Sequence, residues 1–267
     1  MTLTISPSKI ARALLCIVFG LTSLNVAGQY ALETFGKKQL HAWHLLSAIN
    51  QFDLGHGYNI PDWYQSSTLL LCALLFAAIA LHKQRTHESF VIRWWLLALL
   101  FLAVSIDEAT EAHEVIANLL QGMLNASGLN NFTWEIPVAV CAFLLLLSYA
   151  RFLATLPRKT CFWLLVGGAI YLSGALGLEA AGTWYLTESG ERDFTLALLS
   201  TAEEFLEMLG VVIFIYTLTD YLSLQVKELR FSLGETAPRS VPTWQPQPVR
   251  LVNQTPQASP ASTASSS

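Results

Sequence analysis

Acidic side chains in this sequence collect near the ends of apolar segments, where carboxylates can bind cations or exchange protons. The first group follows an apolar run and consists of Asp107, Glu108, Glu111, His113 and Glu114. At about 100° of rotation per residue, a continuous helix would place Asp107, Glu111 and Glu114 on one stripe. An ionised side chain costs roughly 3 kcal/mol at the centre of a bilayer. We therefore expect Asp107 to be paired, protonated or in contact with water.

The second acidic group opens the last apolar run and consists of Glu203, Glu204 and Glu207, while Glu179 stands at the end of the run before it. Glu203 and Glu207 are i, i+4 neighbours, and like charges at this spacing destabilise an isolated helix by about 0.2–0.5 kcal/mol. A bound cation or shared protons would make such crowding tolerable. The alternative is that each carboxylate points separately into water.

The type of ligand limits the cation that these residues would bind. Carboxylates with Asn or Thr oxygens favour Ca²⁺, Mg²⁺ or Mn²⁺, whereas adding His113 moves the preference toward Mn, Fe or Zn. A polar loop before the second apolar run supplies the secondary candidates Asp53, His56 and Asn59. The chain has neither Glu-x-x-His nor His-Glu-x-x-His, so we predict neither a helical di-iron centre nor a zincin site. A divalent cation stays one option, and no catalytic residue is assigned.

Six apolar segments must position these side chains, and each approaches the length of about 20 residues that crosses a bilayer. They are residues 10–28, 64–81, 94–113, 136–156, 162–181 and 202–222. Only 13% of the 267 residues are charged, whereas soluble domains average about 25%. We predict an all-α, polytopic transmembrane helix bundle over residues 1–235, with an outer loop at 30–62. A polar cavity would open to the outside between the third, fifth and sixth spans.

The distribution of basic residues predicts the orientation of the bundle. Twelve of the fifteen Lys and Arg residues fall on one side of the six segments, and only Lys37, Lys38 and Arg192 fall on the other. The positive-inside rule then makes both termini cytoplasmic. Residues 10–28 also resemble a signal peptide, whose cleavage would leave five spans.

The end of the chain has a different composition from the apolar segments. Residues 236–267 are rich in Pro and Ser and nearly uncharged, which predicts a disordered cytoplasmic tail. No basic patch with interleaved aromatic residues occurs, so nucleic acid is not an expected partner. The expected partners are the lipid bilayer and a small ion or molecule.

Three motifs resemble those of an uncharacterised group of bacterial multi-spanning membrane proteins. They are Ser105-Ile106-Asp107-Glu108 with His113-Glu114, the Asn-Ile-Pro-x-Trp turn at 59–63, and Glu203-Glu204-x-x-Glu207-Met208-Leu209-Gly210. The resemblance covers residues 40–225 and implies a bacterial inner (plasma) membrane. A fainter similarity links the chain to ceramidase-type membrane hydrolases. Their zinc site includes a His-x-x-x-His pair that this sequence lacks.

These observations lead to one preferred function and two alternatives. The preferred interpretation is a transporter or transport accessory with an outward-facing acidic cavity that binds a cation or protons. The first alternative is a membrane-embedded, metal-dependent hydrolase that acts on a lipid head group or a small exported molecule. The second is a structural or assembly protein whose acids only face water.

Overall fold

A computed structural model describes residues 6–42, 44–55, 57–113, 115–116 and 135–225. The described residues form helices and contain no β-strand. The helices are α1 (Pro7–Ala42), α2 (Leu46–Asn50), α3 (Ile60–Arg85), α4 (Val91–Thr110), α6 (Glu135–Leu153), α7 (Arg158–Leu172), the π-helical η2 (Ser173–Leu178), α8 (Glu179–Ser189) and α9 (Phe194–Gln225). This confirms the predicted all-α class.

Four helical stretches of the described chain are long and apolar enough to cross a membrane. They are Pro7–His41, Ile60–Arg85, Ile136–Leu153 and the run Arg158–Ser189, which joins α7, η2 and α8. Large hydrophobic side chains are exposed along these stretches, among them Phe19, Phe143 and Leu144. Such side chains face lipid without cost in a membrane protein. The four candidate spans indicate an integral membrane protein.

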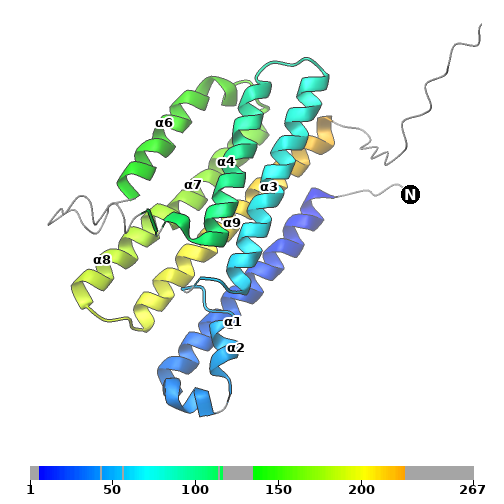
Figure 1. Cartoon of the computed structure of the whole chain (residues 1–267). Helices are drawn as coiled ribbons and strands as arrows, with labels where there is room; N and C mark the ends of the chain where they lie inside the picture. Colours follow the sequence, from blue (N-terminus) through cyan, green and yellow to red (C-terminus); the bar gives the residue numbers. More distant parts are fainter. Residues whose placement is uncertain (1–5, 43, 56, 114, 117–134, 226–267) are drawn as a thin grey trace, which may run out of the picture. The chain divides into compact units, whose positions relative to one another are not determined.

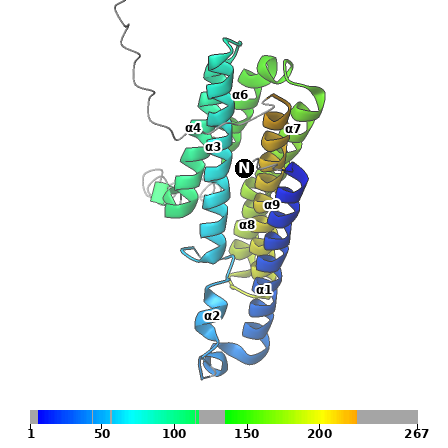
Figure 2. The same ribbon diagram turned by 90° about the vertical axis from the view of Figure 1, so that its right-hand side faces the viewer.

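Helix α9 lies at the centre of the bundle, beside α1, α3 and α7 (Figures 1 and 2). Its residues Val211, Ile215 and Leu218 are fully buried. Near its C-terminal end, the Tyr221 ring stacks on Trp94 of α4 with centroids 5.4 Å apart. Aromatic pairs of this geometry add about 0.5–1.5 kcal/mol beyond the area they bury. The core therefore joins the last helix to the earlier ones.

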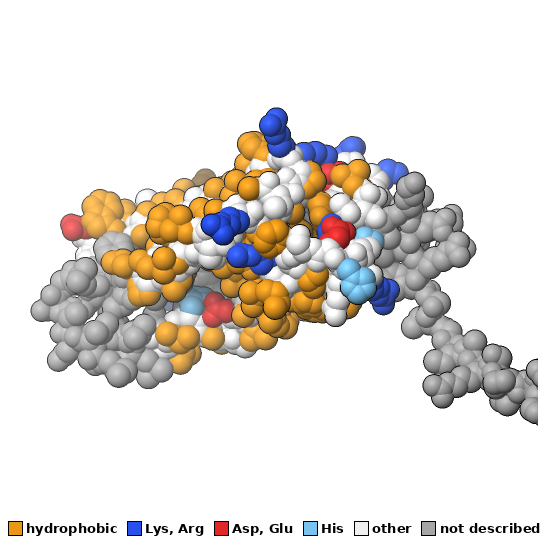
Figure 3. Space-filling view, turned by 90° about the horizontal axis from the view of Figure 1, so that it is seen from above, with side chains coloured by type: hydrophobic (Ala, Val, Ile, Leu, Met, Phe, Trp, Pro, Cys, Tyr) orange, Lys and Arg blue, Asp and Glu red, His pale blue; other side chains and the backbone are white. Residues whose placement is uncertain are grey.

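Local signals explain where α3 begins and ends. The Asn59 side chain accepts a hydrogen bond from the backbone N–H of Asp62, and Asp62 accepts one from Asn59, which forms a capping box. Lys83 and Arg85 occupy the last turn, where positive charge favours the helix dipole. This end and the α6–α7 turn lie at the top of Figure 1. Seen from there, Lys and Arg side chains stand beside broad hydrophobic surfaces (Figure 3).

Two segments differ from the sequence-based expectation. Helix α1 continues to Ala42 and therefore includes part of the segment expected as an outer loop. It is kinked at Gly36, whose φ of 72° is a conformation that glycine adopts readily. The third apolar segment ends earlier than expected, because α4 stops at Thr110 and Glu111 has a left-handed φ of 50°. The predicted stripe from Asp107 to Glu114 on one continuous helix is therefore wrong. The predicted tail, 236–267, lies outside the described residues.

Candidate functional site

A buried carboxylate on α9 marks the candidate site. Glu207 is only 6% exposed, and its Oε2 accepts a 2.8 Å hydrogen bond from Nε2 of Gln65 on α3. Gln65 is itself 1% exposed. The Tyr171 hydroxyl of α7 is a second hydrogen-bond partner of Glu207. Neutral groups from two other helices therefore hold this carboxylate.

Further acids from separate helices lie close enough to interact electrostatically with Glu207 or with one another. Glu108 of α4 interacts with Glu207, with Asp62 and with the Gln65 amide. Glu204 interacts with its neighbours on α9 and with Glu108. We call this group the carboxylate cluster: Asp62, Glu108, Glu179, Glu203, Glu204 and Glu207. The sequence-based expectation that acids of the third, fifth and sixth apolar segments form a cation or proton site stays a prediction.

Small residues bring the helix backbones together at the cluster. A Cβ added at Gly174 in η2 would lie 2.7 Å from the Glu203 carbonyl oxygen and 2.9 Å from Glu207 Cγ. A Cβ at Gly210 would lie 2.8 Å from the Tyr171 backbone nitrogen. Only glycine permits such contact. The π-helical turn that carries Gly174 belongs to a class of backbone irregularity frequent at functional sites.

The ion pairs found in the described part of the chain lie outside the cluster. They join Lys83 to Glu88, His113 to Asp107 and Lys159 to Asp220. Within the same residues, no Lys or Arg forms an ion pair with Glu108 or Glu207. Neither acid therefore has a Lys or Arg partner at ion-pair distance in the part of the chain that the structure describes.

Asp107, predicted as the deepest acid, forms a pair of its own. Its Oδ1 accepts a 2.8 Å hydrogen bond from the His113 backbone N–H, and its Oδ2 lies 2.9 Å from His113 Nδ1. This contact folds the chain back after Thr110. Glu111 then turns toward the preceding loop, where a Cβ on Gly57 would overlap its carboxylate. Asp107, which pairs with His113, and Glu111 still interact electrostatically with Glu108 of the cluster. Glu114 lies outside the described residues.

The secondary candidates of the outer loop have structural contacts. Asp53 is 7% exposed, and its Oδ1 accepts hydrogen bonds from Gln29 Nε2 at 2.7 Å and from the Gly55 N–H at 3.0 Å. Asn59 donates to the Asp53 carbonyl and caps α3. These contacts fasten the loop to α1 and α3. His56 lies outside the described residues.

Metal binding gains no geometric support from the described residues. Within residues 6–113 and 135–225, apart from the few undescribed positions, no three His, Cys, Asp or Glu side chains converge as metal ligands. The divalent cation considered above stays a prediction. Closely spaced carboxylates repel one another when ionised, and this repulsion falls when some of them are protonated.

Sequence reasoning missed three members of the site. Asp62 lies in the predicted outer loop, and neither Gln65 nor Tyr171 is among the predicted site residues. The sequence feature that could have indicated the site is Gln65, a polar side chain at the start of an apolar span. Polar side chains in such spans cost free energy and are often functional. The partner on α9, 142 positions away, was not predictable from spacing.

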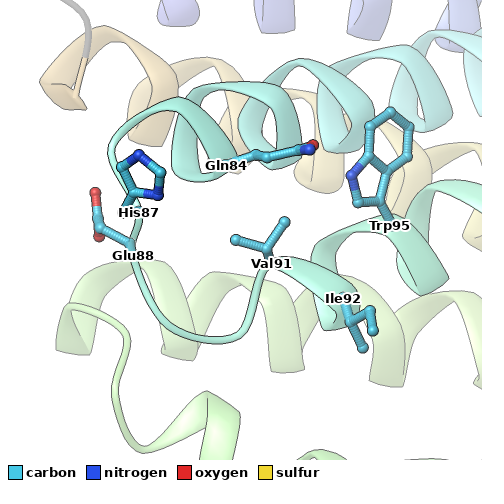
Figure 4. Close-up of a pocket in the computed structure, with 6 residues that line it drawn as sticks. All are labelled: Gln84, His87, Glu88, Val91, Ile92 and Trp95. Carbon is cyan, nitrogen blue, oxygen red and sulfur yellow. The ribbon is translucent and has the colours of Figure 1, made fainter.

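A separate hollow lies at the opposite end of α3 and α4. It has a volume of about 510 Å³ and is lined by Gln84, His87, Glu88, Val91, Ile92 and Trp95 (Figure 4). Figure 4 shows His87 and Glu88 on the connecting loop and Trp95 on α4 across from Gln84. The Lys83 ammonium donates a hydrogen bond to Glu88 and lowers the pKa of that carboxyl below its ordinary value.

The helices, four of which form candidate membrane spans, indicate an all-α integral membrane protein with a carboxylate cluster between its helices. The chain belongs to the family described as Domain of unknown function (DUF8692), whose model matches residues 12–222. The match contains every member of the carboxylate cluster. No curated protein and no solved structure shows significant similarity to this chain.

Proposed function

We propose that the protein crosses a bacterial inner membrane six times, with both termini in the cytoplasm. Helices α4 and α9 lie alongside α3, α1 and α7, so a bilayer around the four candidate spans would also surround them. The basic ends of α3 and the α6–α7 turn would face the cytoplasm. The carboxylate cluster would then lie in the outer half of the membrane.

We propose further that the carboxylate cluster binds protons or a small cation as part of transport. The observation that carries this proposal is the buried Glu207, which is held by the neutral Gln65 and surrounded by other acids. Each ionised carboxylate at membrane depth costs roughly 3 kcal/mol, and unscreened repulsion adds to that cost. Bound positive charge removes both penalties.

The arrangement links binding to helix position, which is what a transporter requires. The acids come from α3, α4, α8 and α9, so their repulsion acts between separate helices. Neutralisation favours close approach of these helices, and loss of the bound charge favours their separation. The close contact at Gly174 makes the η2–α9 interface sensitive to this change. The scaffold alternative predicts instead that neutral variants keep full function.

Liposomes with a trapped pH-sensitive dye test the proposal. A potassium diffusion potential, negative inside, drives proton entry, and parallel samples contain Na⁺ or Ca²⁺ gradients. We expect acidification by the wild type and its loss in Glu207→Gln. The matched control is Glu188→Gln, an exposed acid at the end of α8. Equal ion flux in the wild type and Glu207→Gln would refute the proposal.

Elemental analysis of the same purified protein addresses the divalent cation. We expect no stoichiometric metal to be retained in the wild type or in a Glu111→Gln/Glu207→Gln double variant. One or two metals per chain, lost in that variant, would replace the proton interpretation with a metal site and favour the hydrolase alternative.

A further inference from the structure

The carboxylate cluster contains a buried acceptor that lacks a donor. Gln65 Oε1 is a fully buried atom with no hydrogen-bond partner among the described residues. Leaving such an acceptor unsatisfied costs about 1–3 kcal/mol. Its own Nε2 is used, because it donates to Glu207. A donor that reaches the carbonyl end of the same amide would satisfy this oxygen.

An acidic side chain on a neighbouring helix could supply this donor. Glu108 of α4 is a second carboxyl group that interacts with the Gln65 side chain. As an ionised group Glu108 accepts only, and it would compete with Glu207 for Nε2. As a protonated group it carries one O–H donor. A single proton on Glu108 would satisfy Oε1 and leave Nε2 to Glu207.

We propose that Gln65 joins Glu108 and Glu207 into one proton-binding unit that holds a single shared proton. The protonated carboxyl donates to Gln65 Oε1, and Gln65 Nε2 donates to the ionised carboxyl. Rotation of the amide by 180° exchanges the roles of the two acids without adding a proton, because an amide has one donor side and one acceptor side. This inference rests on the proton binding proposed above and specifies where the proton lies.

Charged and titratable groups surround this unit on several sides. They are Asp62 on α3, Asp107 and Glu111 at the end of α4, Tyr171 on α7, Glu179 on α8, and Glu203 and Glu204 on α9. The carboxylates among them are negative when ionised, so they favour retention of the shared proton. Coupled carboxylates release protons as a group, and the unit must therefore be tested by removing its members singly and together.

Infrared difference spectroscopy of the purified full chain in lipid measures the unit directly. The carbonyl stretch of a protonated carboxyl is separate from that of a carboxylate and shifts in D₂O. At neutral pH we expect the wild type to show a band from this shared proton. Glu108→Gln and Glu207→Gln should each remove it, and the double variant should lose no more than either single variant, because all three changes remove the same proton.

Gln65→Met tests the role of the amide with little change in side-chain volume. Loss of the acceptor should move any remaining carboxyl band to higher frequency, as expected for a weaker hydrogen bond. The control Gln84→Met changes an exposed glutamine on the same helix and should leave the band unaltered. Thermal unfolding of each variant checks that it is folded. Glu108→Gln, at a half-buried position, keeps the test valid should Glu207→Gln not fold.

The possible results separate the two proposals. A carboxyl band that is unaffected by Gln65→Met and by Glu108→Gln would overturn the shared-proton unit and leave proton binding elsewhere in the cluster. Additive losses in the two single variants would show two independent protons and also overturn it. The absence of a protonated carboxyl at any pH would refute proton binding by the cluster altogether.

Discussion

Asn25 of α1 donates a buried hydrogen bond of 2.7 Å to Thr201 of α9, across 176 positions of sequence. Its side-chain oxygen accepts a further hydrogen bond from the Leu54 N–H. One side chain thus fastens the first helix to the last and to the outer loop. Thr201 stands two positions before Glu203, so this contact also fixes the start of the acidic segment of α9.

Replacement of Asn25 should therefore destabilise the bundle. In Asn25→Ala the buried Leu54 N–H loses its acceptor, which costs about 1–3 kcal/mol. We expect a lower midpoint of thermal unfolding in detergent. The control Ser23→Ala removes an exposed hydroxyl of α1 that bonds only to the Phe19 carbonyl, and it should be nearly neutral. An unchanged midpoint in Asn25→Ala would show that α1 is not held by this contact.

Glycine-to-alanine substitutions should lower thermal stability only where the glycine packs closely against a neighbouring helix. Gly174→Ala places a Cβ 2.7 Å from the Glu203 carbonyl oxygen, and Gly210→Ala places one 2.9 Å from the Gly167 carbonyl oxygen. Overpacking of this kind costs about 1–3 kcal/mol. A Cβ at Gly177 meets nothing within 4 Å. We expect Gly177→Ala to be tolerated and the other two to unfold at lower temperature, while equal midpoints for all three would contradict the interface.

Stability should depend on pH through Glu88. The pKa of Glu88 is lower in the folded chain than in the unfolded chain because Lys83 donates to it. Its ion pair therefore stabilises the fold above the ordinary Glu value of 4.5. That contribution disappears as pH falls through the lower, folded value. Glu88→Gln should flatten the acid side of the stability profile. Glu188→Gln is the control, and identical profiles for wild type and Glu88→Gln would argue against the ion pair.

The orientation of the helices predicts which loops a reagent can reach. After the four native cysteines are replaced, a single cysteine is introduced as Thr86→Cys or as Gly190→Cys for labelling. If α3, α4 and α9 all cross the membrane, position 190 reacts with an impermeant reagent from outside and position 86 reacts only after the membrane is opened. Reaction of both positions from outside would contradict the six-span topology.

The helical segments were predictable from the sequence. Each of the six apolar segments overlaps a described helix or helical run, because apolar length is a local property of the chain. The i, i+4 spacing of Glu203 and Glu207 likewise places both on α9 through local helix geometry. The acidic character of the site was therefore readable before any tertiary contact was known.

Tertiary structure alone decided which side chains meet. Gln65 and Glu207 come together because α3 lies beside α9, and the glycines at 174 and 210 let η2 and α7 approach α9 closely. Helix α4 ends at Thr110, and the His113 backbone N–H donates to Asp107, a contact that helical periodicity does not encode. Periodicity specifies the faces of a helix, whereas the pairing of faces follows from packing between residues far apart in sequence.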